Sequence, residues 1–329
     1  MGTPLSARRA ARYRPSTPHL LLVALALVVS ACGQSTSPTP SASASPTVAA
    51  TSTPTAIPTA TPLPTPEPLN SAMLDHRFTV LIVGEDVDAA RRARGYRGDN
   101  TDAIMVVSAS ARQKKVFMVS LPRDNVNIPL ANGQIWTGKV NAIANSYGMD
   151  ALRQAMETLY GIDIPYYVKV NMDDFVDLVD AVGGINVDVK TIVRDDRWGL
   201  YLTPGRVHLD GRTALYYSRA RYFDSDYARA ARQQQVIHAL AAKYSGRKTM
   251  VNLGQLLGTL TGLETNLPLD DLPTLIALAR RAARAPYVAE VLTPPTYALG
   301  WGDQHDGRGW VIIPNVEAMR AELRRLISG

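Results

Sequence analysis

A cluster of arginines at the start of a long predicted helix is the feature that most constrains this fold. The chain from Asp226 to Tyr244 is rich in alanine and glutamine, which favour helix, and Asp226 is a suitable N-cap residue. On a helical wheel the apolar side carries Arg229, Arg232, Gln233, Val236, Ile237 and Leu240. The opposite side carries Gln234, Gln235 and His238. Because an apolar side faces the core, we expect both arginines of this helix to point into the protein.

Two more arginines, Arg219 and Arg221, come shortly before this helix. A helix N-terminus favours anions and disfavours cations, so arginines gathered there indicate a bound phosphate or pyrophosphate. The alternative is that the arginines pair with internal carboxylates, or lie along the rim of the apolar side with their charged ends in water. Only Asp224 and Asp226 are near in the sequence, too few to neutralise four arginines, and we therefore favour an anion site.

The N-terminus has the pattern of a secretion signal. Four arginines between positions 8 and 14 precede an apolar run from Leu20 to Val29, which is too short for a comfortable membrane span. Removing the residues before Cys32 takes the formal charge of the 329-residue chain from +6 to +2. General attraction to nucleic acid is not expected at that charge, so nucleic acid is not an expected partner.

Cys32 is the only cysteine, so no disulfide can form within the chain. The segment Val29-Ser30-Ala31-Cys32 resembles the lipobox of bacterial lipoproteins, which implies cleavage before Cys32 and a diacylglycerol on its thiol. The alternative is an ordinary signal peptide with an incidental cysteine. We favour lipidation because the single cysteine occupies the position that a lipobox requires.

Composition divides the chain into four parts. Residues 33–70 are rich in Ser, Thr, Pro and Ala and contain one charged residue, Glu67, so they are expected to be disordered. We therefore predict a signal peptide (1–31), a lipidated cysteine with a disordered linker (32–70), a catalytic domain (71–248) and a C-terminal α/β extension of that domain (249–329).

Three apolar runs predict buried strands with charged residues at their ends. They are Phe78–Val83, Ala103–Val107 and Val116–Leu121. Asp86 follows the first run, Asp102 opens the second, and Arg123 follows the third. If the first two strands are antiparallel, Asp86 and Asp102 share a sheet edge, where they repel unless a proton or a hard cation lies between them. For either residue alone, a role in a turn is the simpler interpretation.

The remaining chain alternates predicted helices and strands, which indicates an α/β fold. In the last third we expect helices over residues 251–260, 272–283 and 316–327, and a strand over residues 287–292. The sequence contains no G-x-x-x-x-G-K-[ST] phosphate loop, no G-x-G-x-x-G, no G-x-S-x-G and no H-E-x-x-H. A serine hydrolase or a zinc enzyme is therefore not expected.

Eight motifs in sequence order resemble those of the LytR-CpsA-Psr family of cell-wall ligases, over about residues 78–244. They are Gly84-Glu85-Asp86, Thr101-Asp102-Ala103-Ile104-Met105-Val106, Ser120-Leu121-Pro122-Arg123-Asp124, Lys139-Val140-Asn141-Ala142, Phe175-Val176-Asp177-Leu178-Val179-Asp180-Ala181-Val182-Gly183-Gly184-Ile185, Leu209-Asp210-Gly211-Arg212-Thr213-Ala214-Leu215, Arg219-Ala220-Arg221 and Arg229-Ala230-Ala231-Arg232-Gln233. The resemblance implies a central mixed sheet flanked by helices on both faces.

Members of this family transfer glycopolymers such as teichoic acids from a polyprenyl-pyrophosphate carrier to peptidoglycan. The resemblance implies a phosphotransferase of this kind, with the lipid of its substrate in a long apolar groove. The family is mostly anchored by a transmembrane helix; here the lipobox replaces it, and we expect a lipid anchor at the extracytoplasmic face of the membrane. Asp86 and Asp102 would hold Mg²⁺, with Mn²⁺ as the alternative ion, and would form the catalytic group together with Arg123. The resemblance, together with the inward-facing side of the predicted helix, gives the residues that we expect to bind pyrophosphate. They are Arg123, Lys139, Arg219, Arg221, Arg229, Arg232 and Gln233.

Two other functions would use the same residues. A polyprenyl-pyrophosphate phosphatase would take water as its acceptor, and a non-enzymatic module would use the arginines only to dock a lipid or the cell wall. Paired carboxylates near the arginines favour an enzyme, since docking needs no metal. In one departure from the family, Asn100 stands where an arginine is usual, and Arg97 is the candidate replacement.

Overall fold

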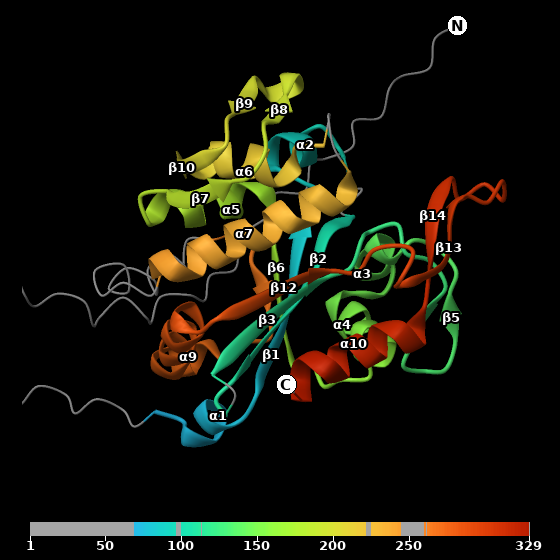
Figure 1. The fold of residues 1–329 in the computed structure, drawn as a ribbon, viewed down its shortest axis with the longest axis horizontal. Coiled ribbons are helices and arrows are strands. Elements are labelled where there is room, and N and C mark those ends of the chain that lie inside the picture. Colours follow the sequence, from blue (N-terminus) through green and yellow to red (C-terminus); the bar gives the residue numbers. More distant parts are fainter. Residues whose placement is uncertain are drawn as a thin grey trace, which may run out of the picture. The chain divides into compact units, whose positions relative to one another are not determined.

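A six-stranded mixed β-sheet forms the centre of the structure, with strand order β11-β6-β1-β2-β3-β12 (Figure 1). Its strands are β1 (Phe78–Glu85), β2 (Thr101–Ser110), β3 (Lys115–Ser120), β6 (Tyr166–Val170), β11 (Glu264–Thr265) and β12 (Tyr287–Val291). This computed structural model describes residues 69–96, 100–112, 114–221, 225–244, 260 and 262–328, all within the unit Pro64–Gly329. The predicted signal peptide, Cys32 and the linker lie outside these residues.

The central three strands are antiparallel neighbours, and the outer pairings are mixed. β1 pairs antiparallel with β2, and β2 pairs antiparallel with β3. β6 runs parallel to β1 and β12 parallel to β3, whereas β11 is antiparallel to β6. The antiparallel β1–β2 pair meets the condition under which the ends of the first two strands share an edge.

Helices cover both faces of the sheet (Figure 1). On one face, Leu81 and Val83 of β1 pack with Ile104 and Val106 of β2 in the largest buried cluster. That face is covered by α3 (Ile143–Tyr147), α4 (Met149–Tyr160) and α10 (Val316–Ser328). The opposite face is covered by α7 (Asp226–Tyr244) and α9 (Leu272–Arg284). The predicted α/β fold, with a central mixed sheet flanked by helices on both faces, is confirmed.

A second apolar cluster builds a smaller layer beside α7. It contains Phe175 and Val179 of α5 (Met172–Ala181), Tyr217 of α6 (Gly211–Arg219), and buried residues of two hairpins. The hairpins pair β7 (Ile185–Val189) with β10 (Gly205–Leu209), and β8 (Val193–Asp195) with β9 (Leu200–Leu202). This layer fixes the end of α6, from which the first arginines of the cluster project.

The remaining elements are short. They are α1 (Ser71–Asp75), α2 (Ala89–Ala93), β4 (Ile128–Pro129), β5 (Ile135–Trp136), η1 (Val140–Ala142), η2 (Asp196–Trp198), η4 (Leu269–Asp271), and the hairpin of β13 (Ala298–Asp303) with β14 (Trp310–Pro314). The predicted helix over residues 251–260 lies outside the described residues except for its last residue. Among the described helices, none has the length and apolarity needed to cross a bilayer.

Two expectations for α7 are wrong. The N-cap is Ser225, whose hydroxyl accepts a hydrogen bond from the backbone N–H of Ala228, and Asp226 is the first helical residue. Gln234, which the helical wheel places on the outer side, is buried. Its side-chain amide donates to Ser120 Oγ and to the backbone oxygen of Glu290. Strands β3 and β12 therefore cover a side of α7 that periodicity assigns to solvent.

Candidate functional site

A β-bulge brings the two predicted carboxylates together. Gly84 pairs with Ala103, but the next residue of β1, Glu85, pairs with Thr101, so Asp102 is an extra residue in β2. Successive strand residues normally point to opposite faces, and a bulge re-aims the side chain that it contains. Asp102 and Ala103 both line the same cavity as Asp86. The strand ends thus place both carboxylates at one pocket.

Asp86 and Asp102 also line a polar pocket that is rich in arginine. The six arginines lining it are Arg91, Arg123, Arg197, Arg219, Arg221 and Arg229. The lining has six guanidinium groups and two carboxylates, and Asp124, Asp195 and Asp226 lie against it, so the positive groups still outnumber the negative ones. Such an excess favours an anion with several charges, since each guanidinium binds phosphate oxygens through charge-assisted hydrogen bonds.

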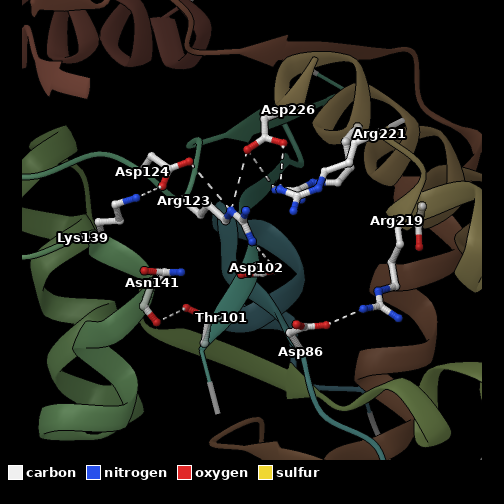
Figure 2. A network of polar contacts seen from close by, with 12 residues as sticks. Asp86, Thr101, Asp102, Arg123, Asp124, Lys139, Asn141, Arg219, Arg221 and Asp226 are labelled. Atoms are coloured by element: carbon white, nitrogen blue, oxygen red, sulfur yellow. Dashed lines mark hydrogen bonds and ion pairs between the residues drawn. The ribbon is translucent and has the colours of Figure 1, made fainter. Parts of the chain in front are cut away.

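Asp86 connects two of these arginines. One of its carboxylate oxygens accepts a hydrogen bond of 2.6 Å from Arg219 Nη2, and the other lies 3.0 Å from Arg91 Nη1 (Figure 2 shows the contact with Arg219). Arg91 also donates to the backbone oxygen of Asp86 at 2.8 Å. Asp86 therefore holds a guanidinium from the end of α6 beside one from α2.

Arg123 stands at the centre of the second half of the network (Figure 2). Its Nη1 donates to Asp102 Oδ2 at 2.5 Å, and its Nε lies 3.7 Å from Asp226 and 3.8 Å from Asp124. Burial lowers the pKa of Arg123, but the carboxylates of Asp102, Asp226 and Asp124 outweigh it and raise the pKa overall. Nε itself is buried and forms no hydrogen bond within the described residues, so its only charged neighbours are these two more distant carboxylates.

Arg229 is the most buried arginine of the pocket, at 6% exposure. Its closest carboxylate oxygen, on Asp226, is 3.6 Å away. Burial lowers the pKa of Arg229, and the positive charge of Arg123 adds to this effect. The side chain nevertheless stays charged, because arginine does not lose its proton in proteins. A buried, weakly paired cation in a pocket is a strong indication of an anionic ligand.

Asp226 serves several arginines at once, a role that the sequence did not indicate. It lies 3.6 to 3.7 Å from nitrogen atoms of Arg123, Arg221 and Arg229 (Figure 2). Because Ser225 caps the helix, the Asp226 carboxylate remains available for these contacts. The expectation that too few acids are near is therefore wrong in detail, since Asp86 and Asp102 come from distant strands. The arginines still outnumber the carboxylates.

The other predicted anion-binding residues lie in three different positions. Gln233 lines the polar pocket and donates to the backbone oxygen of Ser218 at 3.3 Å. Lys139 pairs with Asp124 at 2.6 Å, next to Arg123 (Figure 2). Arg232 is buried and donates to the backbone oxygen atoms of Tyr217 and Ala220, so it connects α7 to the end of α6. It is not among the residues that line the pocket.

Sequence reasoning missed three residues of this pocket, Arg91, Arg197 and Trp198. Arg91 belongs to α2, and the other two belong to η2, which connects β8 to β9. All three lie in short segments between strands, where charged residues are normally solvated. Arg97, the candidate replacement for the arginine that Asn100 lacks, lies outside the described residues.

An apolar cavity adjoins the polar pocket and shares part of its lining. Both are lined by Asp86, Asp102, Arg219 and Gln233. The cavity continues between Ile82 and Met105 of the sheet, Phe175 of α5, and Val236 and Ile237 of α7. A second apolar cavity lies further along the same strands, lined by Phe78 and Val80 of β1 and by several leucines of the C-terminal part. The arginine-rich pocket and the apolar cavity therefore adjoin each other at Asp86 and Asp102.

Two carboxylates fit the way in which proteins bind Mg²⁺ better than a site in which every metal ligand is a protein side chain. Within the described residues there is no group of three or more His, Cys, Asp or Glu side chains arranged as metal ligands. Mg²⁺ commonly uses one or two carboxylates and takes its other ligands from water and substrate phosphates. Asp86 and Asp102, beside an anion-binding pocket, fit that mode.

The chain matches a known protein family along most of its length. The model of the LytR_cpsA_psr family matches residues 47–289, which extends beyond the eight motifs at both ends. This chain belongs to that family. A relative in Enterococcus faecalis, named polyisoprenyl-teichoic acid–peptidoglycan teichoic acid transferase TagU, is 33% identical over 74% of this chain and 77% of its own length. A Bacillus anthracis protein of the same name is 30% identical over 59% of this chain and 62% of its own length.

Solved structures of the LytR_cpsA_psr relatives have the same fold. Bacillus subtilis TagV has a TM-score of 0.60 and 27% identity, covering 77% of this chain and 98% of that protein. A structure described as TagT bound to LIIa-WTA has a TM-score of 0.59 and 25% identity, covering 78% of this chain and 91% of TagT.

Proposed function

We propose that this protein is an extracytoplasmic phosphotransferase that moves a glycopolymer from a polyprenyl-pyrophosphate carrier to peptidoglycan. The observation that carries this proposal is the junction of an arginine-rich pocket with an apolar cavity at Asp86 and Asp102. A polyprenyl pyrophosphate has a charged end and a long apolar chain, and this junction offers a place for each. The names of the relatives as teichoic acid transferases support a teichoic-acid-like polymer as the cargo.

In the proposed reaction, an acceptor hydroxyl of peptidoglycan attacks the phosphorus that carries the glycopolymer. A new oxygen–phosphorus bond forms, the phosphoanhydride bond breaks, and polyprenyl phosphate leaves. Arg123, Arg219 and Arg229 would hold the phosphate oxygens in line and neutralise the charge that develops on them. Asp86 or Asp102 would accept the proton of the hydroxyl. Mg²⁺, held by these two carboxylates, would add further charge neutralisation at the phosphates.

Substrate binding would exchange the partners of the arginines. In the structure, Arg219 is bound by Asp86, and Arg123 is bound by Asp102. Phosphate oxygens bind guanidinium groups strongly and through two bonds at once. The arginines would turn from the carboxylates to the phosphates, leaving the carboxylates available to Mg²⁺ and to the acceptor.

The site of action would be the outer face of the cell membrane. A lipidated Cys32 would provide the anchor, and the linker of residues 33–70 would separate the catalytic domain from the lipid surface. Both segments lie outside the described residues, so this part of the proposal is supported by the sequence alone.

The proposal is tested by transfer of a lipid-pyrophosphate-linked glycopolymer to isolated peptidoglycan. We expect Asp86→Asn and Asp102→Asn each to lower Mg²⁺-dependent transfer by at least about 100-fold, as is usual when one electrostatic group of a transition state is lost. Their melting temperatures should fall moderately, because Arg219 or Arg123 loses its carboxylate partner, so transfer is compared at a temperature at which all variants are folded. Asp188→Asn, an exposed carboxylate on β7, is the matched control.

Two outcomes would contradict this assignment. Full transfer by Asp102→Asn in chelator-treated buffer would show that the reaction needs neither this carboxylate nor a metal ion. Release of polyprenyl phosphate at the same rate with and without peptidoglycan would identify a hydrolase, since water would then be the acceptor.

A further inference from the structure

The β8–β9 hairpin supplies part of the polar pocket through its connecting turn. β8 ends at Asp195, η2 follows as Asp196–Trp198, and Gly199 closes the turn with φ of 64°. Glycine adopts this left-handed conformation without strain, so the chain reverses directly after Trp198. Arg197 and Trp198 therefore lie at the tip of the hairpin, and both line the pocket.

Asp195 is fully buried, at 0% exposure, and its contacts go to the arginines of the pocket. Arg197 Nε donates to one carboxylate oxygen at 2.8 Å, and Arg197 Nη2 lies 2.5 Å from the other, so the pair is bidentate. The backbone N–H groups of Arg197 and Arg221 also donate to this carboxylate. Hydrogen bonds from Arg197, the largest influence, lower the pKa of Asp195. One buried carboxylate thus contacts both Arg197 and Arg221.

Trp198 places Arg197 beside an arginine of the proposed pyrophosphate site. Its indole ring stacks on Tyr216 of α6 at 5.3 Å between centroids. The guanidinium carbon atoms of Arg197 and Arg219 lie 4.7 and 5.0 Å from the centre of the same indole ring. Attraction of each cation to the aromatic ring offsets part of the repulsion between the two guanidinium groups.

We propose that Arg197 is a further phosphate-binding residue of the donor pocket, and that Asp195 is the positioning residue that orients the Arg197 guanidinium and holds the backbone of Arg221 in place beside the anion. The inference rests on the proposed function, because the anion is taken to be the pyrophosphate of the lipid carrier. Asp195 is buried behind the hairpin turn and acts only through its two arginines. Arg197 is half exposed, and it lines the pocket together with Arg219 and Arg221.

The test measures binding of inorganic pyrophosphate by calorimetry and the KM and kcat of transfer for the lipid-linked donor. Arg197→Gln should weaken pyrophosphate binding by roughly 10- to 100-fold, the effect of one charge-assisted hydrogen-bonded contact. Asp195→Asn should weaken it by about tenfold, because the arginines remain but lose their orientation. Both should raise the KM for donor more than they lower kcat.

A double-mutant cycle separates positioning from general damage to the fold. If Asp195 acts mainly through Arg197, adding Asp195→Asn to Arg197→Gln should weaken pyrophosphate binding by less than about threefold more, the remainder belonging to Arg221. Arg197→Lys should restore part of the binding, because it keeps the charge and loses the planar fork. Arg194→Gln and Asp196→Asn, which break an exposed ion pair on the same hairpin, are matched controls that should bind like wild type.

Wild-type pyrophosphate affinity in Arg197→Gln would overturn the proposal, and so would fully multiplicative effects in the double mutant. If Asp195→Asn fails to fold, the comparison of Arg197→Gln with Arg197→Lys still decides whether Arg197 binds the anion. Failure of the proposed function looks different, because the wild-type protein itself would then bind no pyrophosphate and transfer no glycopolymer.

Discussion

Among single residues, Arg229 is the clearest case of a side chain that is placed for a ligand at a cost to stability. Its guanidinium is buried, and the nearest carboxylate oxygen is at 3.6 Å. Arg219, in contrast, shares a 2.6 Å contact with Asp86. Removing a poorly compensated buried cation relieves a desolvation cost, whereas removing a well-paired one leaves its partner carboxylate alone. The two arginines should therefore respond differently to the same substitution.

We predict that Arg229→Met keeps or raises the melting temperature of the ligand-free protein and weakens pyrophosphate binding by roughly 10- to 100-fold. Arg219→Met should lower both, because Asp86 loses its partner. Thermal unfolding with and without pyrophosphate and Mg²⁺ distinguishes the two variants, since a ligand that binds more tightly raises the melting temperature further. A larger loss of ligand-free stability in Arg229→Met than in Arg219→Met would identify Arg229 as a structural residue.

Among the structural elements, α7 shows how far periodicity predicts this fold. The length of α7 and the inward direction of Arg229 and Arg232 follow from helix propensity and the apolar side. The sequence does not indicate that strands β3 and β12 cover a second side, which buries Gln234. Hairpin β13–β14 and turn η2 were missed because short segments carry little periodicity, and with η2 the contribution of Arg197 was missed.

Gln234 provides a test of this second contact surface. Gln234→Ala removes the hydrogen bonds to Ser120 and to the carbonyl of Glu290, and leaves buried polar groups without partners. We expect the free energy of unfolding to fall by about 1–3 kcal/mol in urea denaturation. Gln154→Ala, at an exposed position of α4, should change it by less than about 0.5 kcal/mol. Equal effects of the two substitutions would mean that the buried amide contributes nothing specific.

For the whole molecule, the pocket assembles residues from strand ends, helix ends and a hairpin that are distant in sequence. Asp86 and Asp102 were predicted as neighbours from strand order alone, and their antiparallel strands confirm the assumption behind that prediction. The contact of Asp86 with Arg219 was not predictable, because pairing across 133 residues depends on how α6 packs beside the sheet. The anchor stays a prediction from the sequence.

We predict that the mature protein begins at an acylated Cys32 and fractionates with membranes. Cys32→Ala should leave the signal segment uncleaved or release the protein, because no other thiol is available for a lipid. Mass spectrometry of the intact protein, together with membrane fractionation, measures both results. A mature protein whose Cys32 carries a free thiol would contradict the lipoprotein interpretation.

Because of the bulge at Asp102, the site depends on one extra residue in β2. Deleting Asp102 would restore an unbroken ladder of β2 with β1 and a more regular strand. No carboxylate of β2 would then join Asp86 at the pocket. Changing the length of the connection from residue 87 to residue 100 does not alter the pairing of β2 with β1. Insertions and deletions in that connection that spare Arg91 should thus leave the carboxylate pair intact, whereas deletion of Asp102 should disable the site, even where each remaining side chain keeps its chemistry.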